Sequence, residues 1–301
     1  MKFCSIFLFF LSTYSVDAQQ TTTGNDLRWD LQKPLKNNNK NILIISKSSL
    51  YTVTLIGLNE LWYIKYPKSN FHFINDNGEW LQMDKFGHAM TSYYTGFAGI
   101  KAYKWAGFND KESIWYGGMS GSLFLTIIEY LDGRSEKWGA SSGDLIANSF
   151  GSFLVISQAL VWNDQKILLK YSYFPSKWAK YNPEQLGASH LERALKDYNG
   201  QTYWISLNLK SLLNIDDINF PKWLNLAFGY SANAMVNAYE SPASSYARNR
   251  QFLMSFDIDL NKIKTKNKLL NSVIHTFGFL KIPAPTLEFR KNSFYFNPVY
   301  Y

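Results

Sequence analysis

The residues with the clearest chemical potential form a short motif in the first third of the chain. Asp84, Lys85 and His88 belong to the segment Asp-Lys-Phe-Gly-His, in which Asp84 and His88 are four residues apart. If the segment is helical, these two side chains share one face of the helix. An imidazole beside carboxylates can bind a divalent metal ion, or it can act as a general base that a carboxylate orients.

More polar residues occur at two later points of the chain. Glu129 and Asp132 stand just before Gly133-Arg134, and Asp144 and Asn148 repeat the four-residue spacing. The pattern predicts three long helices, from about Asp84 to Ala106, from Asp110 to just before Gly133, and from about Ser141 to Trp162. Their ends carry recognisable signals: Gly107 suits a helix C-terminus, and Asn109 with Glu112 and Ser141 with Asp144 suit helix starts.

Helix length indicates that these polar residues meet. The short connection around Gly107–Asn109 requires the first two helices to be antiparallel neighbours. His88 and Glu129 are equally far from that connection, at about 28 Å for a rise of 1.5 Å per residue. The third helix starts at the same end. One end of the helices should therefore collect Asp84, Lys85, His88, Glu129, Asp132, Asp144 and Asn148.

We take four of these residues as candidate catalytic groups or metal ligands: His88, Asp84, Glu129 and Asp144. Four more are candidate ligand-binding residues: Lys85, Asn148, Asp132 and Arg134. The sequence specifies no particular metal or cofactor.

A purely structural interpretation of the same residues stays open. Carboxylates such as Asp84 and Asp144 at helix starts cap the helix and interact favourably with its dipole. Glu129 and Lys85 could form an ordinary ion pair. A second acidic pair, Asp257 and Asp259, lies on one face of an expected strand, where we expect a solvated polar surface and not a metal site.

The predicted helices are rich in small residues and poor in charge. Gly96, Gly99, Gly117, Gly121 and Gly151 fall inside them, and small residues four apart allow close helix contact. The segments 113–128 and 145–162 contain no charged residue and are slightly shorter than the ~20 residues that span a bilayer. An intramembrane bundle and a tightly packed soluble bundle are both compatible with this content of small and uncharged residues.

The second half of the chain has a different period. A short helix is expected over 189–199, and apolar residues then alternate with polar ones over 203–209, 224–230 and 252–260, with a further strand expected over 289–296. Alternation is typical of antiparallel strands with one buried face. We therefore predict an α+β fold: a mainly helical bundle of three to four long Gly-rich helices over 42–165, followed by a short helix and short antiparallel strands over 166–301.

The N-terminus resembles a secretory signal. Lys2 precedes an apolar stretch over 3–11, and Val16-Asp17-Ala18 fits a cleavage site, so we expect a signal peptide over 1–18 and a polar linker over 19–41. The single cysteine, Cys4, would leave with the signal. A disulfide framework and an N-terminal lipid anchor on cysteine are therefore not expected.

The composition of the chain indicates which classes of binding partner to expect. Aromatic residues make up 17% of the chain, charged residues 18%, and the formal net charge is +8. An exported basic protein meets anionic lipid head groups or polyanionic wall polymers, so a membrane lipid or another envelope component is the expected partner. Nucleic acid is not expected, because the basic residues are scattered and no nucleic-acid-binding motif occurs. P-loop, Rossmann and nucleophile-elbow motifs are missing too.

Three segments carry a resemblance to a known family: residues 84–88, residues 129–133 and residues 139–148. They resemble the uncharacterised predicted periplasmic lipoproteins (domain of unknown function 2279), and residues 196–204 resemble Bacteroidetes-type members. More distantly, the chain is similar to VanZ-like membrane proteins. The resemblance implies export to the periplasm or an envelope membrane of a Gram-negative bacterium, and marks Asp84, His88, Glu129, Asp144 and Asn148. The missing lipobox cysteine departs from the lipoprotein pattern.

These observations predict an exported, membrane-associated envelope protein with a structural or ligand-binding role. The alternative is a hydrolase or transferase that acts on an envelope lipid or cell-wall precursor, with His88 as base or ligand. The sequence leaves the oligomeric state open.

Overall fold

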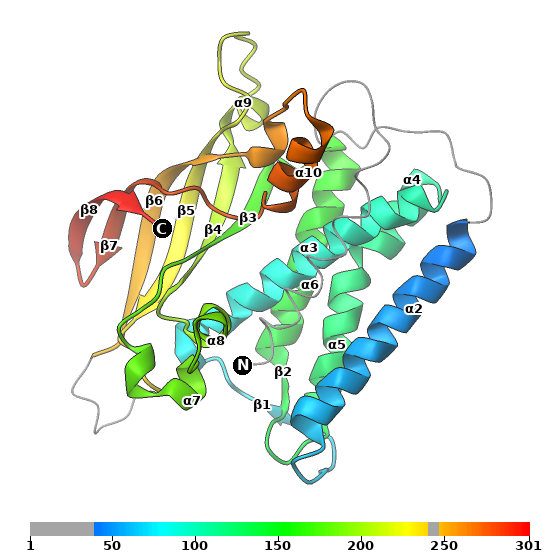
Figure 1. Ribbon diagram of the computed structural model, residues 1–301, viewed down its shortest axis with the longest axis vertical. Helices are drawn as coiled ribbons and strands as arrows, with labels where there is room; N and C mark the ends of the chain where they lie inside the picture. The colour runs from blue at the N-terminus through cyan, green and yellow to red at the C-terminus, as the bar shows by residue number, and fades with distance from the viewer. Residues whose placement is uncertain (1–38, 240–246) are drawn as a thin grey trace. The chain divides into compact units, whose positions relative to one another are not determined.

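The computed structural model describes residues 39–239 and 247–301, which form a mixed structure of helices and antiparallel sheet (Figure 1). They divide into two compact units. The helical unit contains residues 39–77 and 88–163, and the sheet unit contains residues 78–87 and 164–301. The expected boundary at residue 165 thus falls at Asn163/Asp164, and the segment Gly78–Gly87 is an unexpected part of the sheet unit.

The expected signal peptide and most of the expected linker lie outside the described residues. Only positions 39–41 of that linker are described, and they are helical, because the first helix begins at Asn39.

The helical unit contains most of the long helices. Its elements are α2 (Asn39–Leu58), α3 (Met83–Trp105), α4 (Asp110–Glu112), α5 (Ser120–Gly133), α6 (Ser142–Trp162), and a short parallel pair, β1 (Phe73–Ile74) with β2 (Ala140–Ser141). Residues 83–87 of α3 belong to the sheet unit. Helix α5 lies beside both α2 and α6 (Figure 1).

The expected helix ends are confirmed. Gly107 has a positive φ of 87° after α3. Asn109 and Glu112 form a complete capping box at α4, and the Ser141 side chain accepts a hydrogen bond from the Asp144 amide at the start of α6. The expected helix from Asp110 to Gly133 is interrupted, because a π-helical turn (η4) occupies Ser113–Gly117 before α5 begins.

Small residues allow α3 to pack closely on its neighbours. A Cβ atom on Gly121 would collide with the Ser92 carbonyl, and one on Gly151 would collide with the Ala89 carbonyl. These obstacles are backbone atoms, which cannot rotate away. The interior glycines are therefore kept for packing, although each costs about 1 kcal/mol of helix propensity.

The outer faces of these helices are apolar and their inner faces are rich in polar groups. Ile146, Phe150 and Phe153 of α6 are exposed, whereas Asn148 and Ser152 on the same helix are buried. Within the described residues, α2 and α6 are long and apolar enough to cross a membrane, by length and composition only.

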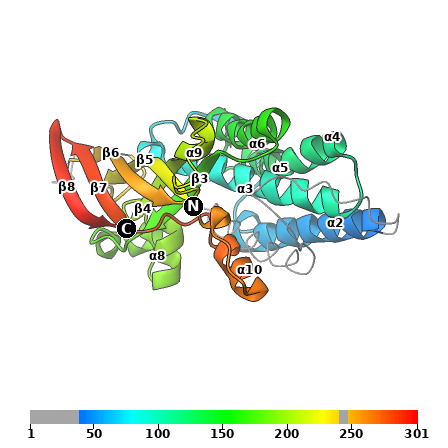
Figure 2. The same cartoon turned by 90° about the horizontal axis from the view of Figure 1, so that it is seen from above.

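The sheet unit is built on a six-stranded antiparallel meander. Each strand pairs with its neighbour in the chain, in the order β3 (Ile167–Tyr173), β4 (Gln201–Asn208), β5 (Leu224–Asn233), β6 (Asn249–Ile258), β7 (Ala284–Arg290) and β8 (Ser293–Tyr300) (Figure 2). The connections contain α7 (Pro183–Leu186), α8 (His190–Lys196), α9 (Leu209–Leu212) and α10 (Lys268–Thr276).

The expectations for this unit need correction at four points. Residues 289–296 are not one strand but a hairpin, because Lys291 and Asn292 have positive φ values of 47° and 57° and reverse the chain between β7 and β8. Strand β3 was not expected, since its apolar run is interrupted by a lysine. The expected helix over 189–199 ends at Lys196, and β5 and β6 are ten residues long and therefore not short.

The polarity of the sheet is the reverse of the expected one. Asp257 and Asp259, assigned to a solvated face, are 2% and 0% exposed. On β6 the residues Phe252, Met254 and Phe256, which alternate with them, are exposed instead. Alternation predicts two faces of different polarity, but it does not say which face the protein covers.

Candidate functional site

Three buried residues of the helical unit bring their ligand atoms together. His88 of α3, Glu129 of α5 and Asp144 of α6 each place one nitrogen or oxygen within 4.8 Å of the others. Their exposed fractions are only 3%, 3% and 6%. Helix length predicts these three residues at one level of the helices, and the structure brings them together there.

Both ring nitrogens of His88 have a defined neighbour. Nδ1 lies 3.0 Å from Oδ1 of Asn148, and Nε2 lies 3.4 Å from Oδ2 of Asp144. An amide oxygen can only accept a hydrogen bond, so this contact assigns a proton to Nδ1. In the neutral imidazole, the lone pair is then on Nε2, which faces the carboxylate.

The start of α6 holds the two carboxylates. The Ser141 backbone N–H donates to Oε2 of Glu129 at 2.9 Å, and the Ser141 hydroxyl accepts from the Asp144 N–H at 3.1 Å. The same hydroxyl donates to Oδ1 of Asp76 at 2.6 Å. The sequence indicates Ser141 only as a helix cap, and the buried Asp76 is not among the residues that it marks.

Asn148 is supported from the opposite side. Its backbone carbonyl accepts a hydrogen bond of 2.6 Å from the Ser92 hydroxyl, which also contacts the Ser152 hydroxyl at 3.0 Å. The Asn148 side chain is fully buried, and its Nδ2 has no hydrogen-bond partner among the described residues. Asn148 therefore contributes to the site by holding the His88 ring through its hydrogen bond to Nδ1.

The other candidate residues make interactions of their own. Asp84 and Lys85 fall in the part of α3 that belongs to the sheet unit, and they form an ion pair of 2.9 Å with each other. Asp132 accepts a hydrogen bond of 2.9 Å from the Tyr63 hydroxyl. The pKa of Tyr63 is raised well above its usual range, mainly by burial and next by the negative charge of Asp132. Arg134 is an exposed residue at the C-terminus of α5.

A second group of buried charges lies in the sheet unit. Nζ of Lys170 is 2.7 Å from Oδ2 of Asp257, and Lys262 pairs with Asp164 at 3.0 Å. The Ser206 hydroxyl also donates to Asp257 at 2.7 Å. Burial raises the pKa of Asp259. Each described ion pair in this group is matched in charge, so the group is adequately explained as an internal network.

His88, Glu129 and Asp144 can hold a cation or transfer protons. One imidazole and two carboxylates form a mixed nitrogen and oxygen ligand set, which suits zinc and several other divalent ions. A proton on Nδ1, held by Asn148, orients the ring as outer-shell partners of metal-bound histidines do.

Comparison with protein-family models, curated proteins and solved structures gives no match for this chain. The chemistry of the site must therefore be argued from its own geometry.

Proposed function

We propose that this chain is an exported envelope protein whose helices form a membrane-associated bundle, and that His88, Glu129 and Asp144 bind a divalent metal ion in it. Membership of the predicted periplasmic lipoprotein family, based on the motif segments, is part of the same proposal. The cluster binds a ligand with the three residues as direct contacts and Asn148 as a positioning residue.

The distance between His88 Nε2 and Asp144 Oδ2 carries the metal assignment. A charge-assisted N–H···O bond is typically about 2.7–2.9 Å long, which is clearly shorter than the 3.4 Å found here. Two ligands about 2.0–2.1 Å from one tetrahedral zinc ion are themselves separated by about 3.4 Å. The pair is thus spaced as co-ligands of one ion. Glu129 supplies a third ligand.

The distribution of polar groups supports the membrane part of the proposal. Large apolar side chains are exposed on α5 and α6, as for Leu123 and Phe153, while Ser92, Ser120 and Ser152 are buried between helices. Soluble proteins rarely expose such contiguous apolar surface. Ionisable residues inside a membrane bundle typically face its interior and mark a functional site.

A hydrolase or transferase acting on an envelope lipid is the second candidate. It is favoured by an apolar groove of about 300 Å³ on the helical unit, lined by Trp115, Met119, Phe153, Ile156 and Leu160 among others. An acyl chain fits the chemistry of this groove, and from Ile156 it would have to extend about 18 Å along α6 to reach the site, because Ile156 is twelve residues from Asp144. In that case a metal-bound water or His88 itself would be the base.

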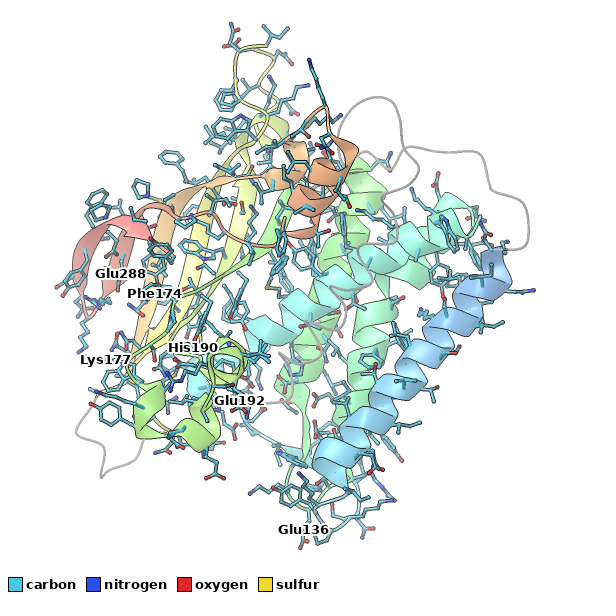
Figure 3. All side chains as sticks on the ribbon, in the orientation of Figure 1. Glu136, Phe174, Lys177, His190, Glu192 and Glu288 are labelled. Atoms are coloured by element: carbon cyan, nitrogen blue, oxygen red, sulfur yellow. The ribbon has the colours of Figure 1, made fainter. Side chains whose placement is uncertain are left out.

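Metal analysis of the mature chain tests the first candidate. We expect the protein, after incubation with Zn²⁺ or Mn²⁺ and removal of excess ion, to retain one equivalent, and His88→Ala to lose it. The matched control is His190→Ala, because His190 is an exposed histidine on α8 (Figure 3). Glu129→Gln keeps the side-chain shape and should also lower the affinity at least tenfold.

Two results would contradict the proposal. One is a wild-type protein that retains neither ion, and the other is a His88→Ala variant that retains the ion at full stoichiometry. Circular dichroism of each variant shows whether the loss of metal comes with loss of the fold. If His88→Ala unfolds, the isosteric Glu129→Gln variant decides.

A further inference from the structure

We infer that the sheet unit has its own lipid-facing surface, formed by the exposed apolar face of strands β4 to β8. The inference deepens the proposed envelope location, on which it rests, by assigning a lipid contact to the part of the chain outside the helices. It is independent of the metal site.

One row of side chains crosses five strands on this face. The strand register aligns each member with the next, and all five are between 39% and 63% exposed. We call this the apolar row: Ile205, Phe228, Met254, Leu287 and Phe296. Phe252, Phe256 and Phe294, on the same face, are also exposed. The surface is therefore continuous and not a set of isolated apolar residues.

The neighbouring row points to the other face and has the opposite character. The register aligns five small or polar residues there, of which the first four are buried and the last is half-buried: Ser206, Ala227, Ser255, Thr286 and Asn297. Glu288 of β7 (Figure 3) and Asp257 of β6 are further buried acids on this side. A water-soluble antiparallel sheet buries its apolar face and solvates its polar one.

The reversed polarity indicates what kind of environment meets the exposed face. Alternation of apolar residues outward and polar residues inward is the pattern of strands that face lipid. From Phe252 to Ile258 the face extends about 20 Å along β6, at about 3.3 Å per residue. That length is comparable with the apolar band of a lipid-facing sheet, about 25 Å tall.

Charge at one end of the face agrees with a lipid partner. Arg250 is exposed and precedes Phe252 on the same side of β6, and Lys291 is exposed in the β7–β8 turn. Because Phe252 pairs with Phe289, the register brings both cations to one end of the sheet. The chain also carries a net charge of +8. Anionic head groups at that end would complement these cations while acyl chains cover the apolar row.

The face, and not the edge of the sheet, makes this contact. Strand β8 pairs only with β7 among the described strands. Unpaired backbone groups on an open strand edge are not stable in hydrocarbon. The sheet therefore lies with its apolar face against the lipid and its β8 edge at the interface.

A single environment-sensitive fluorophore on the mature full-length chain tests the inference. Cysteine is introduced at Met254 or at Phe296 of the mature chain, from which Cys4 has been removed with the signal segment, and labelled with a nitrobenzoxadiazole probe. Vesicles of phosphatidylethanolamine and phosphatidylglycerol are added, with or without nitroxide groups on the acyl chains. We expect a severalfold rise in emission at both positions, and quenching by the acyl-chain nitroxide.

Two further labelled positions make the result specific. Ile218→Cys, an exposed apolar site in the β4–β5 connection of the same unit, should show no change. Phe153→Cys on α6 reports the membrane association of the helical unit. A response at Phe153 without one at Met254 and Phe296 overturns the inference but leaves the proposed function intact.

Three other outcomes also overturn the inference. An emission rise that depends on protein concentration without vesicles means that a second copy covers the face. A probe shielded at every dilution, and unaffected by vesicles, means that the chain covers the face itself. Failure of the labelled protein to float with vesicles means that it makes no lipid contact.

Discussion

Replacing Lys170 by methionine should reveal the strength of the buried ion pair in the sheet unit. Both Lys170 and Asp257 are 0% exposed in their side chains, and their charged atoms are 2.7 Å apart. Methionine keeps the unbranched stem but removes the charge. Breaking a buried pair at one partner typically costs about 3–5 kcal/mol, because it leaves the other charge without compensation. Lys281, which also acts on Asp257, places the expected cost near the lower limit.

Substitution of the second residue of the pair, Asp257, tests whether the loss of stability comes from its uncompensated charge. In the double variant Lys170→Met with Asp257→Asn, neither member of the pair carries a buried charge, and the amide can still accept the hydrogen bond from the Ser206 hydroxyl. We therefore expect it to recover most of the lost stability, to within about 1 kcal/mol of the wild type, since a paired polar group costs little. The coupling between the two sites then has the sign expected for residues in direct contact.

Thermal unfolding followed by circular dichroism measures these effects. One kcal/mol corresponds to about 2–4 °C for a unit of this size, so a cost of about 3 kcal/mol should lower the Tm of Lys170→Met by about 6–12 °C. The exposed Lys222→Met substitution is the matched control and should stay within about 0.5 kcal/mol. The reasoning is refuted if Lys170→Met melts with the control, or if the double variant is as unstable as the single one.

Other predictions concern pH, packing, turn geometry and the site. Burial lowers the pKa of Lys281 from 10.5 to about 8. Between pH 8 and pH 10.5 the unfolded chain therefore binds more protons than the folded one, and the free energy of unfolding rises with pH. Urea titrations over this range should show a smaller rise for Lys281→Met than for the wild type. The Cβ atom of Gly151→Ala would collide with the Ala89 backbone carbonyl, so this variant should lose about 1–3 kcal/mol of stability or more. Gly57→Ala has open space around the new Cβ atom and should be neutral or stabilising by up to about 1 kcal/mol. Asn292→Gly, at φ 57°, should raise Tm slightly, and a lower Tm would contradict the turn geometry. Asn148→Ala should weaken metal binding about 10–100-fold in a competition titration without removing a ligand.

The sequence determined the local features that depend on neighbouring residues. Asn109 with Glu112, Ser141 with Asp144 and the positive φ at Gly107 appear where capping and glycine chemistry predicted them. Helix length also sufficed to bring His88 and Glu129 to one level, because an α-helix has a fixed rise per residue. Lys291-Asn292 was missed because neither residue signals a turn as strongly as glycine does.

Only the tertiary structure decided which residues complete the site and which side of the sheet is covered. Asp84 forms an ion pair with its neighbour Lys85, while Asn148 of α6 contacts His88 of α3 directly. The period-two pattern of β6 is the same whether Phe252 or Asp257 faces inward. A sequence records the spacing of residues along one element, but burial depends on the other elements that pack against it.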